Sequence, residues 1–139
     1  KAVSGATGSA YTVPASLLGK KLSLTVTARR TGHLDGTVTT SAVTVAKGAA
    51  PKATKAPAIS GTAKVGRTLT ASHGTWTPAP ASYRYQWYAS GKAISGATKS
   101  KLVLKSAQRG KKITVKVTAV RGGHSSGVAT SRATAAVAR

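Results

Sequence analysis

Apolar and polar residues alternate in a series of short segments along the second half of the chain. A period of two places successive side chains on opposite faces of a β-strand, so each segment predicts a strand with one buried face. Ser-Gly, Arg-Gly and Gly-Gly pairs between the segments indicate turns. The predicted strands cover residues 67–71, 82–90, 101–105 and 113–119, with a weaker one over 128–137. No stretch keeps a helical period beyond two turns, so the pattern predicts an all-β sandwich or barrel.

The alternation also predicts which side chains form the core. In 82–90, for example, the aromatic residues at odd positions share the inward face, whereas Arg84, Gln86 and Tyr88 share the outward face. Trp76 lies in a loop bounded by Gly and Pro, where alternation does not place it. The predicted inward set is Leu69, Ala71, Tyr83, Tyr85, Trp87, Leu102, Leu104, Ile113, Val115, Val117 and Ala119.

The beginning of the chain repeats its end. When residues 1–48 are laid on 92–139 at a constant offset of 91, 19 positions are identical. Self-similarity at a fixed period is typical of tandem modules. We therefore expect residues 57–139 to be a complete module and residues 1–46 to be the C-terminal half of a preceding one. Residues 47–56, which contain Pro, Lys and small residues, are predicted to be a semi-extended linker.

The half module has a physical consequence. Because the first copy begins at the midpoint of the second, we expect the chain to be a fragment of a longer protein. The strands present in the half module leave Leu22, Leu24 and Val26 without an opposing sheet. We therefore expect residues 1–46 to be loosely ordered or to pack improperly on their own.

The composition agrees with a β-rich chain. Thr, Ala, Val and Ser dominate, and the 40% hydrophobic share is enough for a packed core. There is no cysteine, so neither a disulfide nor thiolate chemistry is available. No apolar run approaches the roughly 20 residues of a membrane-spanning helix. We expect no membrane insertion, and we expect a monomer.

An ordered series of segments resembles the immunoglobulin-like repeats of secreted and cell-wall-associated actinobacterial proteins. The segments are 61–70, 74–76, 85–87, 91–98 and 110–118, and the resemblance extends over 57–139 and, from its midpoint, over 1–46. It implies an immunoglobulin-like antiparallel β-sandwich with Trp87 as the core tryptophan. The cysteine pair of antibody domains is missing, and Leu69 with Val115 or Val117 is expected in its place. It also implies an extracellular, wall-associated location and a stalk or accessory role, sometimes beside wall-degrading enzymes.

The residues argue against an enzyme. Glycoside hydrolysis needs two positioned carboxylates, whereas Asp35 is the only acid in the chain. His33 and Asp35 lie in one turn without a nucleophile elbow for a Ser-His-Asp arrangement. We therefore expect no catalytic residues. We expect His33, His73 and His124 to lie in turns and not to form a metal site. We also expect no cofactor.

The charge is the most unusual property of the composition. Lys and Arg total 22, which gives a formal net charge of +21. Such a field attracts polyanions. Lys101 and Lys105 are predicted to face outward from one sheet and other cations from the second, so the charge surrounds the module instead of lining one groove. This argues against specific nucleic-acid recognition, in which cations concentrate where bases are read.

One outward face combines an aromatic ring with cations. Strand alternation places Arg84, Tyr88, Lys112 and Lys116 on it, which is a candidate site for a wall polyanion or a glycan, although a solvated sheet face is the simpler interpretation. Three hypotheses follow. The chain is a spacer or stalk between neighbouring repeat modules of a wall-associated protein, or it binds an anionic wall polymer or glycan, or it is an accessory region of a wall hydrolase whose catalytic domain lies outside it.

Overall fold

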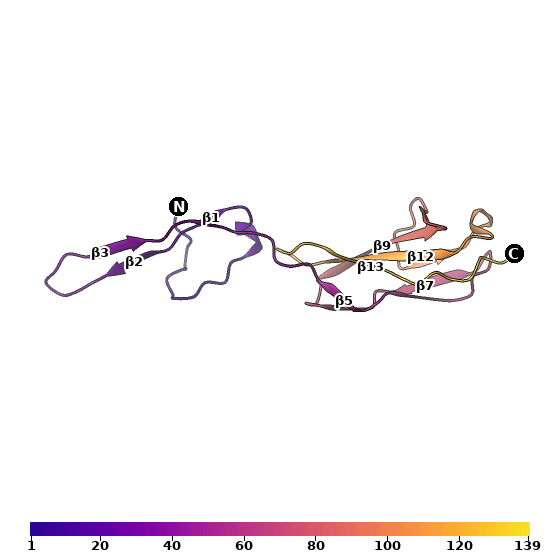
Figure 1. The fold of residues 1–139 in the computed structure, drawn as a ribbon, viewed down its shortest axis with the longest axis horizontal. Helices are drawn as coiled ribbons and strands as arrows, with labels where there is room; N and C mark the ends of the chain where they lie inside the picture. The colour runs from indigo at the N-terminus through magenta and orange to yellow at the C-terminus, as the bar shows by residue number, and fades with distance from the viewer. The chain divides into compact units, whose positions relative to one another are not determined.

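The computed structural model describes residues 1–139 and confirms that the chain is all β, with 40% of its residues in strands and no α-helix. The chain divides into two compact units, Lys1–Gly48 (unit 1) and Ala49–Arg139 (unit 2), which are described separately. In Figure 1, unit 1 is drawn in indigo and purple, and unit 2 runs from magenta to yellow.

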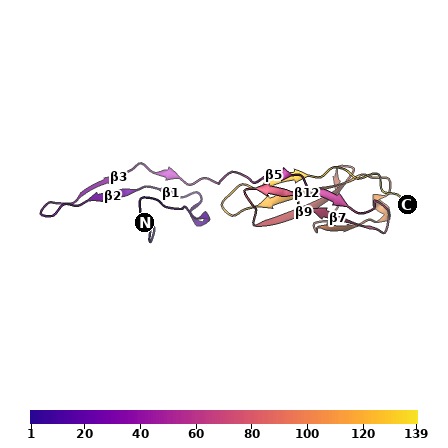
Figure 2. The same cartoon turned by 90° about the horizontal axis from the view of Figure 1, so that it is seen from below.

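Unit 2 is built from antiparallel strands in three groups. A four-stranded sheet has the order β10-β9-β12-β13, a three-stranded sheet has the order β11-β7-β6, and β5 pairs with β8. The long strands β9 and β12 are neighbours in Figures 1 and 2. The strands are β5 (Lys52–Lys55), β6 (Ala58–Ser60), β7 (Thr68–Ser72), β8 (Thr75–Thr77), β9 (Ser82–Ala89), β10 (Lys92–Ala93), β11 (Lys101–Val103), β12 (Ile113–Val120) and β13 (Gly127–Thr130), with one 3₁₀ turn, η2 (Ser106–Gln108).

The two larger sheets of unit 2 share one hydrophobic core. Trp87 of β9 has no exposed surface, and its indole Nε1 donates a hydrogen bond to the carbonyl oxygen of Lys99 at 2.7 Å, so the ring is buried without an unpaired donor. Tyr83 and Tyr85 are half-buried, and every other side chain of the predicted inward set is buried. The main core cluster is Leu69, Ala71, Trp87, Ala89, Leu102, Leu104, Ile113, Val115 and Val137.

Trp76, which alternation could not place, is also a core residue. It lies on β8 and forms a second buried cluster with Val117 and Ala119. Its indole Nε1 donates a hydrogen bond to the carbonyl oxygen of His73 at 2.7 Å. The inward residues of β12 therefore belong to two clusters. Ile113 and Val115 are part of the main core, whereas Val117 and Ala119 pack with Trp76.

Two sequence-based boundaries differ from the structure. Residues 52–55, expected within a linker over 47–56, form β5 and pair with β8, and Pro51 is fully buried, so unit 2 begins earlier than residue 57. The last strand, expected over 128–137, ends at Thr130, and the chain beyond it is irregular. The irregular segment still contributes to the core, because Ser131 and Val137 are buried.

Gly127 is where the β5 segment packs on β13, and it provides a test of that packing. A Cβ at Gly127 would overlap the carbonyl oxygen of Pro51 and would lie 3.0 Å from the Trp76 ring. We expect Gly127→Ala to lower the free energy of unfolding by about 1–3 kcal/mol, the usual cost of overpacking. Gly122→Ala is the matched control, because its Cβ would meet no atom within 4 Å. Urea unfolding of both variants measures the difference, and equal midpoints would contradict the packing.

Unit 1 has the same kind of strands but little buried surface. It contains one 3₁₀ turn and two separate two-stranded ladders, β1–β4 and β2–β3. No residue of unit 1 is buried, and Leu24, Val26 and Val38 are exposed. The elements are η1 (Ala15–Leu17), β1 (Lys21–Leu22), β2 (Thr25–Ala28), β3 (Gly36–Thr39) and β4 (Val43–Thr44).

The backbone pairing of unit 1 recurs in unit 2 at an offset of 91. The register of β2 with β3, in which Val26 faces Val38, has the same positions as that of β12 with β13, in which Val117 faces Ala129. Side-chain hydrogen bonds recur as well. The amide of Leu24 donates to Thr40 Oγ1 at 3.0 Å, and the equivalent amide of Val115 donates to Ser131 Oγ at 3.0 Å. The 3₁₀ turns 15–17 and 106–108 and the turns at His33 and His124 also correspond.

Candidate functional site

The outer face of the four-stranded sheet carries the four residues singled out from the sequence. Three of them alternate with inward-facing residues on β9 and β12. In the register of these strands, Tyr88 faces Thr114, Lys116 faces Gln86, and Arg84 faces Thr118. Residues two apart in register are diagonal neighbours on one sheet face, within reach of long side chains. Arg84 and Tyr88 are therefore both diagonal neighbours of Lys116.

Tyr88 and Lys116 are in direct contact. The Nζ atom of Lys116 lies 5.5 Å from the centroid of the Tyr88 ring, a cation–π geometry. Both residues are half-buried, so part of each remains accessible to solvent. The pair thus presents a cation and an aromatic surface together, the combination that contacts sugar rings or anionic groups.

Lys112 and Arg84 stand at opposite ends of this face. Lys112 immediately precedes β12, and its carbonyl oxygen accepts a hydrogen bond from the amide of Ser90 at 2.8 Å. Arg84 lies near the other end of β9, and both side chains are exposed. The structure thus joins Tyr88 and Lys116 by contact and places Lys112 just before β12 and Arg84 near the start of β9.

Unit 2 contains no carboxylate side chain. Asp35, the only acid, belongs to unit 1, where its Oδ2 lies 3.2 Å from Arg29 Nε in an exposed ion pair. Residues 49–139 hold 16 of the 22 basic residues. Burial raises the pKa of the Tyr85 phenol, and the neighbouring Tyr83 phenol raises it further, so this ring stays neutral beneath the charged surface. The charged side chains of unit 2 are therefore all positive at neutral pH.

The histidines occupy turns, as the sequence predicts. His33 and His124 lie between paired strands, and His73 lies between β7 and β8. No group of three His, Cys, Asp or Glu side chains is arranged to hold a metal ion. The His73 ring stacks on the Tyr83 ring, with the ring centroids 4.0 Å apart. The alternation of apolar and polar residues did not predict this contact. The Tyr83 ring in turn packs against the second cluster, with its centroid 6.5 Å from that of the Trp76 ring.

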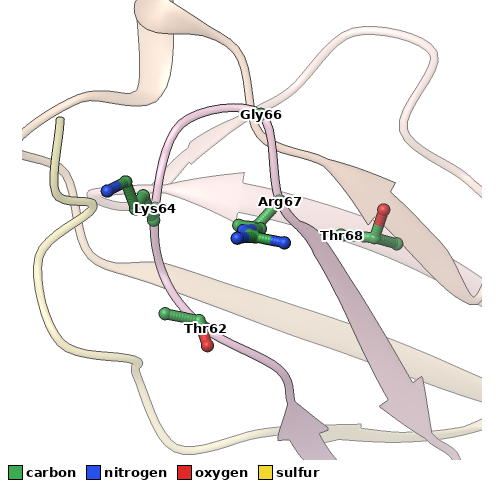
Figure 3. A pocket seen from close by; sticks show the side chains of 5 residues that line it. All are labelled: Thr62, Lys64, Gly66, Arg67 and Thr68. Atoms are coloured by element: carbon green, nitrogen blue, oxygen red, sulfur yellow. The ribbon is translucent and has the colours of Figure 1, made fainter.

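The loop between β6 and β7 encloses a hollow that also holds two cations. Figure 3 shows it lined by Thr62, Lys64, Gly66, Arg67 and Thr68, all of which are exposed. The amine of Lys64 points away from the guanidinium of Arg67 in this view, so the two groups do not converge on one point. The loop is fixed instead by backbone bonds, because the amide of Val65 donates to the carbonyl oxygen of Ala138 at 3.0 Å. We assign no ligand to this hollow.

A second hollow, of about 270 Å³, lies beside β11 and was not identified from the sequence. Its lining includes Lys99, Lys101 and Lys105 together with half-buried apolar residues of the turn 94–97. The sequence did contain a signal for it, since Val103 is an apolar residue at an outward position between two lysines.

Comparisons of the chain with protein-family models, with curated proteins and with solved structures find no match. None of its helices is long and apolar enough to cross a membrane. The functional argument therefore depends on the geometry described above.

Proposed function

We propose that the chain is part of a non-enzymatic, immunoglobulin-like tandem repeat that acts as a spacer in an extracellular, cell-wall-associated protein. The observation that carries this proposal is the recurrence of strand register, turns and side-chain hydrogen bonds at an offset of 91. Structural repeats that contact only their neighbours along the chain build quasi-one-dimensional proteins, which suits a spacer.

The strand order of unit 2 supports the immunoglobulin-like assignment. The neighbours β9-β12-β13 correspond to strands C, F and G of that fold, and β6-β7-β11 correspond to A, B and E. Trp87 lies on the strand equivalent to C. It packs in one cluster with Leu69 of β7 and Val115 of β12, the strands that carry the cysteine pair in antibody domains.

A second candidate function is attachment to an anionic wall polymer or glycan. The Lys116–Tyr88 contact, on a face shared with Arg84 and near Lys112, favours it. The absence of any carboxylate side chain from unit 2 favours it as well, because every cation is available to an external anion.

Co-sedimentation of the chain with Gram-positive cell walls separates the two candidates. The walls are used native and stripped of teichoic acid, each at low and at moderate salt. For the spacer, no sedimentation with either wall is expected. For the polymer-binding function, sedimentation disappears on stripping, and its salt dependence reports the number of phosphate contacts, with a log–log slope of about 0.7–0.9 per contact.

A pair of variants with equal loss of charge tests the face itself. Lys112→Gln combined with Lys116→Gln is expected to reduce the magnitude of the salt slope by about 1.4–1.8, the value for two lost contacts. Lys52→Gln combined with Lys55→Gln is the control, because both lysines are exposed on β5. Equal effects of the two double variants would assign the attachment to diffuse charge and would reject the site on β9 and β12.

A further inference from the structure

Strand β11 is an edge of the three-stranded sheet and has a free backbone side. It pairs only with β7, through a register in which Leu102 faces Leu69. The amide of Ala71 donates to the carbonyl oxygen of Ser100 at 2.7 Å, and the amide of Leu104 donates to that of Arg67 at 2.9 Å. Hydrogen-bonded and non-hydrogen-bonded pairs alternate along an antiparallel ladder. Lys101 and Val103 therefore direct their N–H and C=O groups away from β7.

The hollow of about 270 Å³ lies along this free edge. Leu102 contributes an apolar surface to it, and the turn at 94–97 and the side chain of Gln108 line it as well. Gln108 is itself held in place, because its Oε1 accepts a hydrogen bond from the amide of Lys105 at 2.9 Å. The edge is therefore not covered by another strand and has a groove beside it.

The side chains along this edge have a defined pattern. Lys101, Val103 and Lys105 occupy alternate positions and are exposed, so an apolar residue with 55% of its surface exposed stands between two cations. The equivalent positions of unit 1 carry Ala10, Thr12 and Pro14. The pattern thus belongs to unit 2 alone and is not a general feature of the repeated strand.

Lysines on an edge strand commonly prevent pairing with other strands. Here the charge sets the kind of strand that can pair. A second copy of β11 would place Lys side chains opposite Lys side chains, and like charges directly opposite each other destabilise a pair. A strand with carboxylates at the same spacing would have the opposite effect.

We propose that the β11 edge binds an extended acidic segment of a partner protein, which adds as a strand beside β11. Strand addition uses main-chain hydrogen bonds for affinity and alternate side chains for specificity. The segment carries Asp or Glu at its first and fifth positions, opposite Lys105 and Lys101, and a β-branched residue at the third, opposite Val103. The free N–H and C=O groups favour a peptide over a polyphosphate or a glycan, because only a peptide has complementary groups at this spacing. This proposal does not depend on the proposed function.

A synthetic peptide with capped ends and the sequence Thr-Glu-Thr-Val-Thr-Glu-Thr is the probe. It is titrated into the full 139-residue chain labelled with ¹⁵N. We expect the amide signals of Lys101 and Val103 to shift and their hydrogen exchange to slow by at least about tenfold at saturation. A peptide of the same sequence that is N-methylated at alternate residues on its pairing edge keeps the charge but loses the donors, and we expect no slowing with it.

The charge pattern is tested with two double variants that change the net charge equally. Lys101→Glu with Lys105→Glu is expected to weaken peptide binding by at least about tenfold, because two attractions become repulsions. Lys52→Glu with Lys55→Glu should change it by less than about threefold. A peptide with Lys in place of both Glu residues should bind the first double variant better than the unmodified chain.

Three results would overturn the proposal. The first is equal binding of the N-methylated peptide. The second is equal weakening by both double variants. The third is inorganic polyphosphate that slows the Lys101 and Val103 amides as the peptide does, which would identify an anionic polymer as the ligand of this edge.

Discussion

Replacing Trp87 with alanine is expected to remove a large share of the free energy of unfolding of unit 2. Substitution of a fully buried Trp by Ala costs about 3–5 kcal/mol. The total free energy of unfolding of a small domain is about 5–15 kcal/mol, so one change removes a large share of it. Trp87 is the largest fully buried side chain, and it packs in one cluster with residues of both larger sheets. Its loss leaves a cavity between the sheets and leaves the carbonyl oxygen of Lys99 without its indole donor.

Urea unfolding followed by the fluorescence of Trp76 and by circular dichroism measures this loss, since Trp76 remains buried in the second cluster. Tyr88→Ala is the control, because it removes an aromatic ring from the outward face of the same strand and should cost less than about 1 kcal/mol. Trp87→Phe retains most of the apolar volume and should fall between the two. If Trp87→Ala costs no more than Tyr88→Ala, the two sheets do not share the core described here.

The core of unit 2 could be predicted from the sequence because burial follows a local pattern. Ile113, Val115 and Val117 alternate with polar residues over a long strand, and only one register buries all of them. The alternation at Tyr85 and Trp87 is equally local. Neither prediction required knowledge of which strands are neighbours.

The boundaries could not be predicted in this way. The sequence of β5, Lys-Ala-Thr-Lys between prolines, has the composition of a linker. It forms a strand because it pairs with β8. Thr54 Oγ1 lies 2.7 Å from Oγ1 of Thr75, which is 21 residues away in the sequence. Gly127, without a side chain, allows Pro51 to approach. The pairing with β8 and the approach of Pro51 to Gly127 are both tertiary contacts, so local sequence propensity does not predict them.

One candidate site could likewise be predicted from a local pattern, and the other could not. The alternation of side chains along each strand is enough to predict that Arg84, Tyr88 and Lys116 face outward. The edge at β11 depends on the order of strands in a sheet, which alternation does not reveal. An exposed Val103 between two lysines is unusual for a solvated strand, but it acquires a meaning only when the strand is known to be an edge with a groove beside it.

Unit 1 should exchange its strand amides far faster than unit 2, although the two have the same local pairing. Val26 and Val117 occupy equivalent positions of equivalent ladders, yet Val26 is 56% exposed and Val117 is fully buried. An isolated two-stranded ladder is marginally stable in water. The amide of Val117 should open only with unfolding of unit 2, so we expect it to be protected at least about a thousandfold more than that of Val26. Hydrogen exchange followed by NMR measures both amides in one sample, and equal protection would contradict the incomplete core of unit 1.

The cause of the difference can be tested by supplying the strands that unit 2 has and unit 1 lacks. A chain is made in which a copy of residues 48–91 is fused directly ahead of Lys1, so that the order matches the junction of 91 with 92 in unit 2. If the repeat is structural, the copied strands cover Leu24 and Val26 as residues of β7, β8 and β9 pack against Val115 and Val117. We expect protection of the Val26 amide to rise by at least about a hundredfold and a second cooperative thermal transition to appear.

The matched control is the same fused chain with alanine at the position copied from Trp87. It adds equal length and charge, but it lacks the side chain that fills the space between the sheets, so we expect little protection of Val26. Protection by both fusions would mean that chain length or tethering stabilises unit 1. Protection by neither would mean that the shared register of β2–β3 and β12–β13 does not extend to a shared sandwich. Protection by the first alone would show that the exposed apolar face of unit 1 is the inner face of a sheet, and that each module folds only when both of its halves are present.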